Sequence, residues 1–404
     1  MVNTRLIANS TSLNSIGGAG YIGYSYAEPY TSNTVGAQLK SQKNSIDFLI
    51  HKFYGLVSVK DFGALGDGST DDTSAIQDAL DSGANIYFPS GKYRITSTLT
   101  MNTRGQGLYG DSGSVGGKGD ISGNLFGSIL WLDISDAASA TSIITVTANQ
   151  CSFFGMKFIG DAGNAVDIGI LAQKTSNTDD LDMYVLDCEF AYLKNPIITY
   201  GRGLEVDRCV FSALSGGDSV TCYWPSSGTS GDDAQTADLY KGRGFRLTNN
   251  RHHGSGTFLV IDGFKARGLI LAMNMVDFGD RLLRVQNGGG VLYASATGNI
   301  ADLCGSTPIY FGAGSTCEGF SIVGGSLGGV LAGTLDGSDK RPFACVQFEA
   351  PAVLDSLSIT GVNMMNTDAF AVVILNDSAA SPITPTNISI TGGAISGIGQ
   401  SGSN

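Results

Sequence analysis

Two acidic residues on one expected strand have a spacing suited to breaking a glycosidic bond. In the segment LEVDR, Leu204 and Val206 are expected to face the core, so Glu205 and Asp207 project from the same outer face. Residues two apart on a strand lie about 6.6 Å apart at their Cα atoms. Glycoside hydrolysis needs one carboxyl group as acid and another as base or nucleophile, and this spacing is compatible with either stereochemical geometry.

Neighbouring segments supply groups that could surround this pair. Aligning similar segments places Tyr184 of MYVLD and Arg246 of FRLTNNRH on either side of Glu205. The connection from Ser212 to Gly244 holds an aromatic residue for sugar stacking and further carboxylates, namely Trp224, Asp232, Asp233 and Asp238. The alternative for Glu205 and Arg246 is a surface ion pair, which contributes little stability.

A lyase reaction remains open, because a base and a cation for it also occur close together. Such an enzyme removes the proton next to a uronate carboxylate, and the candidates are Tyr240, Lys241, Arg243, Arg246, Arg251, His252 and His253. The adjacent histidines would point in opposite directions on a strand, so at most one faces a substrate. The alternative is that these candidate residues are solvated turn residues without a catalytic role. We expect Tyr240 and Arg251 to contact substrate in either reaction.

No metal site or cofactor is predicted. Asp179, Asp180 and Asp182 stand together in a connection, but a short acidic run is usually only solvated. The glycines near Gly66 do not form a phosphate-binding loop, because no Lys-Ser/Thr pair follows them.

The elements that must position these residues repeat along the chain. Segments of one form recur, among them LEVDRCVF, LILAMNMV and LSITGVNM, with Cys188 and Cys209 separated by 21 residues and Asn274 and Asn299 by 25. A second strand family, including TFLVIDG and RLLRVQNG, runs between them in the same period. Such repeats predict stacked parallel rungs with like residues aligned. Connections break the period at Gly110–Gly127, Ala172–Asp182 and Ser212–Gly244.

The stretch Val57–Thr96 predicts the beginning of this stack. VSVKDFGA alternates as a strand, and a turn covers residues 64–68. A helix follows, capped by Asp71 or Asp72 and stopped at Gly83. NIYFPSGKYRIT then forms two short strands around a turn at Pro89–Gly91.

This stretch, VKDFGALGDGSTDDTSAIQDAL with YFPSGKYRI behind it, closely resembles the opening of the pectate-lyase-like right-handed parallel β-helix of bacteriophage tailspikes and related polysaccharide-active proteins. The resemblance implies an all-β fold, a right-handed single-stranded parallel β-helix over residues 57–404 with an N-terminal capping helix. It also implies a virion protein, assembled in the host cytoplasm and acting at the cell surface. It does not place an active site.

Two further segments precede the β-helix. Residues 1–34, rich in Ser, Asn, Gly and Tyr, are interpreted as a virion-anchoring segment that joins a phage tail or baseplate protein, with a flexible tail as the alternative. Residues 35–56 carry a short coiled-coil pattern, made by Val35, Leu39, Ile46, Leu49 and Phe53 with Gln42 as its polar position. It predicts a stem helix at the centre of a homotrimer, or else a helix packed on its own β-helix.

Composition excludes several other classes of protein. The net charge of −12 argues against nucleic acid as a partner. The 7 cysteines are scattered and odd in number, which favours reduced, buried side chains. No signal-peptide segment follows Met1 and no apolar run is long enough for membrane insertion.

Together these observations predict a homotrimeric phage tailspike that binds and depolymerises a bacterial surface polysaccharide, by hydrolysis in preference to lyase chemistry. The alternative is a structural or receptor-binding virion protein without catalysis, favoured by the absence of an expected C-terminal domain and of an unambiguous carboxylate cluster.

Overall fold

The computed structural model describes residues 55–111, 127–133, 142–160, 166–173, 181–201, 203–212, 217–223, 244–302, 304–328, 344–365, 370–375 and 385–396. The chain divides into two units, Met1–Leu56 and Val57–Asn404, and the second is described below. The expected anchoring segment and coiled-coil stem lie outside the described residues, apart from Gly55 and Leu56. No helix among the described residues is long and apolar enough to cross a membrane.

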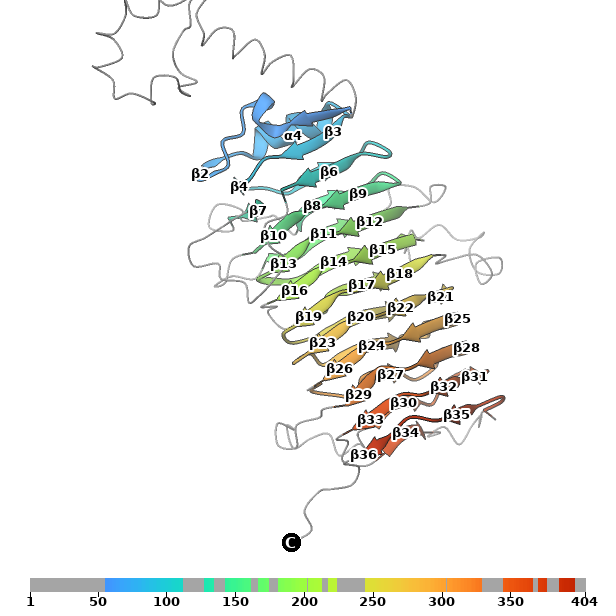
Figure 1. The fold of residues 1–404 in the computed structure, drawn as a ribbon. Helices are drawn as coiled ribbons and strands as arrows, with labels where there is room; N and C mark the ends of the chain where they lie inside the picture. Colours follow the sequence, from blue (N-terminus) through green and yellow to red (C-terminus); the bar gives the residue numbers. More distant parts are fainter. Residues whose placement is uncertain are drawn as a thin grey trace, which may run out of the picture. The chain divides into compact units, whose positions relative to one another are not determined.

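The described strands form three parallel sheets, with each strand hydrogen-bonded to its counterparts in the rungs before and after it (Figure 1). Sheet A contains β1 Leu56–Ser58, β3 Asn85–Phe88, β6 Gly107–Gly110, β9 Cys151–Phe154, β12 Asp182–Leu186, β15 Gly203–Asp207, β18 Phe245–Thr248, β21 Lys265–Arg267, β22 Ile270–Ala272, β25 Gly290–Thr297, β28 Thr316–Val323, β31 Val353–Asp355, β32 Ser358–Thr360 and β35 Ser389–Thr391.

The other two sheets complete each rung. Sheet B contains β2 Asp67–Asp71, β4 Gly91–Ile95, β7 Ser128–Leu132, β10 Met156–Ile159, β13 Glu189–Ala191, β16 Val210–Ser212, β19 Arg251–His253, β23 Met275–Asp277, β26 Ile300–Asp302, β29 Ser326–Gly328, β33 Asn363–Met365 and β36 Ile395–Ser396. Sheet C contains β5 Leu99–Met101, β8 Ser142–Val146, β11 Val166–Ala172, β14 Leu193–Thr199, β17 Val220–Tyr223, β20 Thr257–Asp262, β24 Arg281–Gln286, β27 Ile309–Phe311, β30 Ala344–Glu349 and β34 Phe370–Leu375.

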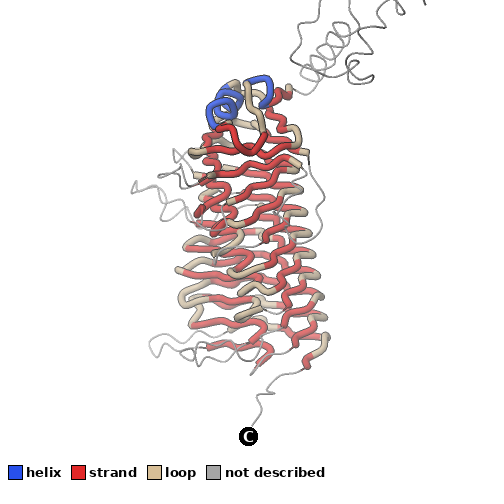
Figure 2. The backbone as a smooth tube through the Cα atoms, turned by 90° about the vertical axis from the view of Figure 1, so that its left-hand side faces the viewer, coloured by secondary structure: helices blue, strands red, loops and turns tan. Residues whose placement is uncertain are grey.

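The predicted parallel β-helix is therefore confirmed, but the two expected strand families become three sheets (Figure 2). Segments such as LEVDRCVF hold two strands, because from β9 onwards one residue between a sheet A strand and the sheet B strand that follows it takes a left-handed backbone. The residues at this corner are Gly155, Asp187, Arg208, Asn249, Met273, Gly298, Gly324, Gly361 and Gly392. Five of these nine corner positions are glycine and four are not. No single residue type therefore marks the corner in the sequence, and the alternation of apolar residues does not reveal it.

The residue after the left-handed position points into the core and stacks from rung to rung. Asn250, Asn274 and Asn299 are buried there and form a ladder of side-chain amides. The Nδ2 of Asn274 donates to Oδ1 of Asn299 at 3.0 Å and to the carbonyl oxygen of Leu247 at 2.8 Å. Its Oδ1 accepts from the backbone N–H of Asn250 at 3.1 Å. The ladder thereby satisfies backbone groups that the turn leaves without partners.

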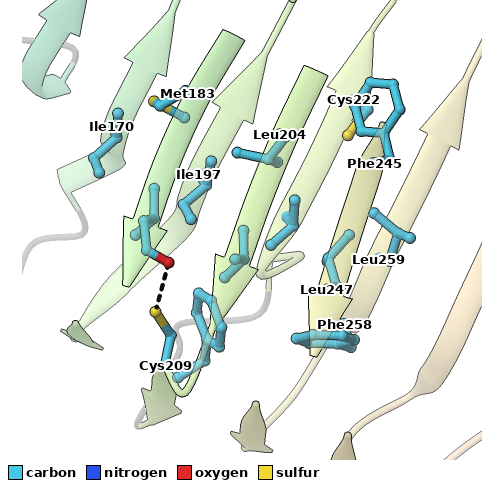
Figure 3. Close-up of a cluster of buried hydrophobic side chains, with 14 of the residues drawn as sticks. Ile170, Met183, Ile197, Leu204, Cys209, Cys222, Phe245, Leu247, Phe258 and Leu259 are labelled. Atoms are coloured by element: carbon cyan, nitrogen blue, oxygen red, sulfur yellow. Dashed lines mark hydrogen bonds between the residues drawn. The ribbon is translucent and has the colours of Figure 1, made fainter. Parts of the chain in front are cut away.

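Earlier in the chain the same position is held by cysteine. Cys188 and Cys209 are buried, as predicted, and Cys209 Sγ lies 3.3 Å from the carbonyl oxygen of Val185 (Figure 3). Among the described residues all seven cysteines are free thiols in the core. Phenylalanine rings also stack from rung to rung: the ring centroids of Phe190 and Phe211 are 5.2 Å apart and the rings are nearly parallel. Like residues thus align along the core, as the period predicts.

The N-terminal cap follows the prediction in outline and differs from it in two places. The helix α4 (Thr73–Asp81) buries Ile76, Ala79 and Leu80 as expected. The VSVKDFGA segment, however, forms only the short strand β1 and then the 3-10 helix η2 (Val59–Phe62), and β2 begins inside the expected turn. Of the two expected capping residues, Asp71 accepts the N–H of Thr73 at 3.0 Å, whereas the carboxylate of Asp72, which stands directly before the helix, accepts the N–H groups of Leu65 and Gly66.

The connection Ser212–Gly244 adds a single rung to the stack. Strand β16 pairs directly with β19, with Val210 opposite Arg251. The described part of the connection contributes β17 to sheet C, and residues 224–243 lie outside the described residues. The 41 residues from Cys209 to Asn250 could span one rung or two by length alone, and the strand pairing shows one.

We expect Asn274→Ala to reduce the free energy of unfolding by about 3 kcal/mol, because it leaves several buried backbone and amide groups unpaired. Equilibrium denaturation in urea measures this change. Asn363→Ala on the exposed face of sheet B is the matched control and should change stability by less than about 0.5 kcal/mol. A loss at Asn274 as small as that of the control would contradict a stabilising ladder.

His252 generates a pH-dependent prediction. The side chain is buried inside the rungs, where Nδ1 lies 2.6 Å from the Ser219 hydroxyl and Nε2 lies 3.0 Å from the Gly254 carbonyl oxygen. Burial lowers the pKa of His252 from 6.5 to about 4. The unfolded chain therefore binds a proton at a higher pH than the folded one, and stability is lost as pH falls from 6.5 towards 4.

Between pH 7.5 and pH 5 this residue should remove about 2 kcal/mol from the free energy of unfolding. An NMR titration of histidine-labelled protein, which has 3 histidines, measures the folded-state pKa directly. We expect one imidazole to stay neutral down to about pH 4. Assignment of His252 to a resonance that titrates near pH 6.5 would refute the prediction.

Candidate functional site

The predicted row around Glu205 lies on the outer face of sheet A. Tyr184 and Arg246 are the register partners of Glu205 in the adjacent strands β12 and β18, as predicted. Leu204 and Val206 are buried, which confirms the alternation. Arg246 Nη1 lies 3.9 Å from Glu205 Oε1, and both side chains are substantially exposed. This long, solvated contact has the character of a surface ion pair of little energy.

Asp207, the second member of the predicted pair, is held by hydrogen bonds and an ion pair at the corner between sheets A and B. Its Oδ1 accepts from Thr248 Oγ1 at 2.6 Å and from Asn249 Nδ2 at 2.9 Å, and its Oδ2 pairs with Arg208. Partial burial by itself would raise the pKa of Asp207, but these hydrogen bonds and the charge of Arg208 hold it below its ordinary value. The group is thus a carboxylate with a structural role at neutral pH.

Apart from Arg246, the described lyase candidates lie on a different sheet from Glu205. Arg251 and His253 lie on the outer face of sheet B, whereas His252 points inward between them, as expected for adjacent strand residues. His253 Nδ1 is 3.4 Å from Asp277 Oδ2. Seven catalytic or substrate-binding candidates lie outside the described residues: Trp224, Asp232, Asp233, Asp238, Tyr240, Lys241 and Arg243. Nothing in the described part of the chain tests those seven.

A second group of polar and aromatic residues, which the sequence reasoning missed, lies on sheet C. Tyr200 follows β14 and Tyr223 ends β17, and their rings stack with centroids 5.3 Å apart and planes at 21°. Asp262 is the register partner of Tyr223 in the next rung. Its Oδ2 accepts from Gln286 Nε2 at 2.9 Å and its Oδ1 from Asn287 Nδ2 at 2.7 Å. These donors hold the Asp262 carboxylate beside the tyrosine pair.

An ion pair stands on the same sheet. Asp218, just before β17, places Oδ2 at 2.5 Å from Arg284 Nη2 and accepts the backbone N–H of Thr257 at 2.8 Å. Arg284 belongs to β24, and both side chains are partly exposed. We name the group formed by Tyr200, Asp218, Tyr223, Asp262 and Arg284 the Tyr223 cluster.

The other members of the Tyr223 cluster all act on the Tyr223 hydroxyl. Burial raises the pKa of Tyr223, and the charge of Asp262, the neighbouring Tyr200 and the charge of Asp218 raise it further, while Arg284 acts in the opposite direction. Tyr223 therefore remains protonated at neutral pH and can donate a hydrogen bond. Because Tyr223 keeps its proton at neutral pH, it is not available there to abstract a proton from a substrate, and the groups of the cluster that can accept a proton are the carboxylates.

The sequence carried a weak signal for this group. The spacing of Asp262 and Asn287 marks the repeat period, and alternation in TFLVIDG and RLLRVQNG places Asp262, Arg284 and Gln286 on the outer side of their strands. Asp218 could not be found in this way, because it precedes its strand. No group of three or more His, Cys, Asp or Glu residues that could hold a metal ion occurs among the described residues.

Sequence comparison finds relatives of the first rungs. A family described as rhamnogalacturonase A/epimerase, pectate lyase-like, matches residues 56–124. The chain is 54% identical over 44 residues to mannuronan C5-epimerase AlgE3 of Azotobacter vinelandii, which is 10% of this chain and 2% of that protein. It is 44% identical over 45 residues to the pre-neck appendage protein of Bacillus phage B103, 11% of this chain and 5% of that protein. The matches thus span a small part of each relative.

Comparison of structures extends along the chain at low identity. The Dettilon tailspike protein aligns with a TM-score of 0.43 and 17% identity, covering 96% of this chain and 73% of that chain. The parallel β-helix architecture follows from the pairing of the strands in the three sheets, independently of this alignment. The chain is thus a parallel β-helix whose opening residues, 56–124, are similar to the pectate-lyase-like family.

Proposed function

We propose that this chain is a phage tailspike protein that binds a bacterial surface polysaccharide and cleaves it by glycosidic-bond hydrolysis at the Tyr223 cluster. The observation that carries the proposal is the presence of two carboxylates on sheet C: Asp262, the register partner of Tyr223, and Asp218, which is ion-paired with Arg284. Hydrolysis of a glycosidic bond requires such a pair as acid and base or nucleophile.

The remaining members of the cluster suit a sugar substrate. The stacked rings of Tyr200 and Tyr223 offer apolar surface beside hydrogen-bonding groups, and this combination matches a pyranose ring with its hydroxyls. Tyr223, which stays protonated, can donate to a substrate oxygen, and Arg284 can stabilise negative charge near Asp218.

The sequence match adds the biological setting to the proposal. The opening residues are similar to a polysaccharide-modifying epimerase and to an appendage protein of a phage, by the names of those relatives. We further propose a homotrimer, held by the stem at residues 35–56 and attached to the phage tail or baseplate by residues 1–34. In this assembly the protein is part of the virion and meets its substrate at the host cell surface.

The row of Tyr184, Glu205 and Arg246 is proposed as a contact surface for polysaccharide. Glu205 lies on an exposed outer face, but Asp207 is committed to Arg208, Thr248 and Asn249 in the corner, and this weakens the pair as catalysts. Trp224, Asp232, Asp233, Tyr240 and Arg251 stay as proposed contributors to substrate binding or catalysis.

We expect Asp262→Asn to reduce kcat for polysaccharide cleavage about 100-fold or more, because the amide has the same shape and keeps one of the two accepted hydrogen bonds but cannot act as acid or base. Asp218→Asn should have a similar effect. Release of reducing ends from purified bacterial capsule and O-antigen polysaccharides measures the rate. Asp302→Asn, on the outer face of sheet B, is the matched control and should keep the wild-type rate.

The outcomes separate the alternatives. Loss of activity in Glu205→Gln together with full activity in Asp262→Asn would show that catalysis takes place at the Glu205 row on the outer face of sheet A. Ultraviolet absorbance of unsaturated uronate products would identify a lyase. Binding of polysaccharide by the wild-type protein without any fall in polymer size would identify a receptor-binding virion protein without catalysis.

A further inference from the structure

An exposed tyrosine occupies a backbone position for which neighbouring rungs use small residues. Strands β21, β25, β28 and β31 pair in register and align Arg267, Leu292, Glu318 and Asp355. The next residue in each of these rungs takes a left-handed backbone. These residues are Gly268 with φ 71°, Tyr293 with φ 51°, Gly319 with φ 65° and Ser356 with φ 55°. A bulky side chain is disfavoured in this conformation by about 1 kcal/mol or more.

Tyr293 is held by groups from the rungs on both sides. The guanidinium carbon of Arg267 lies 5.1 Å from the centroid of the Tyr293 ring, and the Tyr293 hydroxyl donates to Glu318 Oε1 at 3.0 Å. A Cβ atom built on Gly319 would be 3.1 Å from the ring, so the glycine makes room for it. We name Arg267, Tyr293 and Glu318 the Tyr293 patch.

The contribution of these contacts to the stability of the fold does not explain why a tyrosine stands at this position. Tyr293 is 58% exposed, and exposed cation–π pairs and hydrogen bonds contribute little. At some other left-handed positions the chain uses asparagine, at Asn249, Asn287 and Asn387, which tolerates this conformation better, whereas bulky side chains also occur there, at Tyr192, Met273 and Phe278. A strained, exposed aromatic residue oriented by polar partners is a feature of binding sites.

The Tyr293 patch also lies next to the end of sheet C. Asp262 of the Tyr223 cluster is the last residue of β20, and β21, which carries Arg267, begins at Lys265. In the next rung, β24 ends at Gln286 and β25 begins at Gly290. A polymer bound along the ends of the sheet C strands would therefore run towards Tyr293.

We propose that the Tyr293 patch is a sugar-binding subsite that holds one uncharged residue of the polysaccharide at a distance from the bond that is cleaved. The inference rests on the proposed function. The Tyr293 ring packs against the apolar face of the sugar, the Arg267 guanidinium donates to its hydroxyls and Glu318 accepts from one. Glu318 accepts the hydrogen bond of the Tyr293 hydroxyl and Asp355 is the register partner of Glu318, so two negative charges face the one positive charge of Arg267 and disfavour an acidic sugar there.

The test compares matched substitutions at two left-handed positions. Tyr293→Asn removes the ring while keeping a residue that fits the backbone. Met273→Asn is the control, because Met273 is 62% exposed and has φ 55° but lies at the corner between sheets A and B. The probe is a microarray of purified bacterial capsule and O-antigen polysaccharides, followed by titration and kinetics on each polysaccharide that the wild-type protein binds.

We expect Tyr293→Asn to weaken binding about tenfold and to raise KM by a similar factor with kcat within about twofold of wild type. Met273→Asn should change neither quantity, and Tyr293→Phe should keep most of the affinity because the ring remains. Thermal denaturation shows whether each variant is folded. A split between KM and kcat distinguishes a subsite from a merely structural role.

Several results would overturn the inference. Wild-type affinity and KM in folded Tyr293→Asn would eliminate the subsite while leaving the proposed function intact. Equal losses in Tyr293→Asn and Met273→Asn would show a general effect of the backbone position. Binding and cleavage of no polysaccharide by the wild-type protein would eliminate the proposed function and this subsite with it.

Discussion

The in-register stacking of parallel rungs is the constraint on which the structure depends. Strands of successive rungs bond to one another, so the paired segments must stay in register while the connections between them vary in length. The left-handed corner after sheet A keeps this register, and Asn250, Asn274 and Asn299 bind the backbone groups that the turn leaves open. Stacked phenylalanine rings such as Phe190 and Phe211 fill the space between the sheets.

Stacking also explains how chemistry arises on this scaffold. A residue that points outward in one rung stands beside its counterpart in the next, so groups distant in sequence gather in columns. Tyr223 and Asp262 meet in this way on sheet C, and Asp218 and Arg284, which come from rungs two apart, form an ion pair on the same sheet. The same stacking makes other carboxylates structural, because Asp207 and Asp355 each accept from a threonine and an asparagine one rung later.

The sequence predicts the period, the buried cysteines, the α4 cap and the neighbours of Glu205, because these depend on spacing and alternation. The third sheet was missed, because residues as different as Arg208, Met273 and Gly298 turn the corner. The Tyr223 cluster was missed for a related reason. Its members come from separate rungs and one of them precedes its strand, so that only pairing in space brings them together.

The central claim is that polysaccharide is held and cleaved on the outer face of sheet C. Its most direct test is an experimental structure of Asp262→Asn with a bound oligosaccharide released by the wild-type protein from its polysaccharide. The account predicts a sugar within hydrogen-bonding distance of Tyr223 and Asp218. Sugar density centred on Glu205 of sheet A, with sheet C unoccupied, would contradict it.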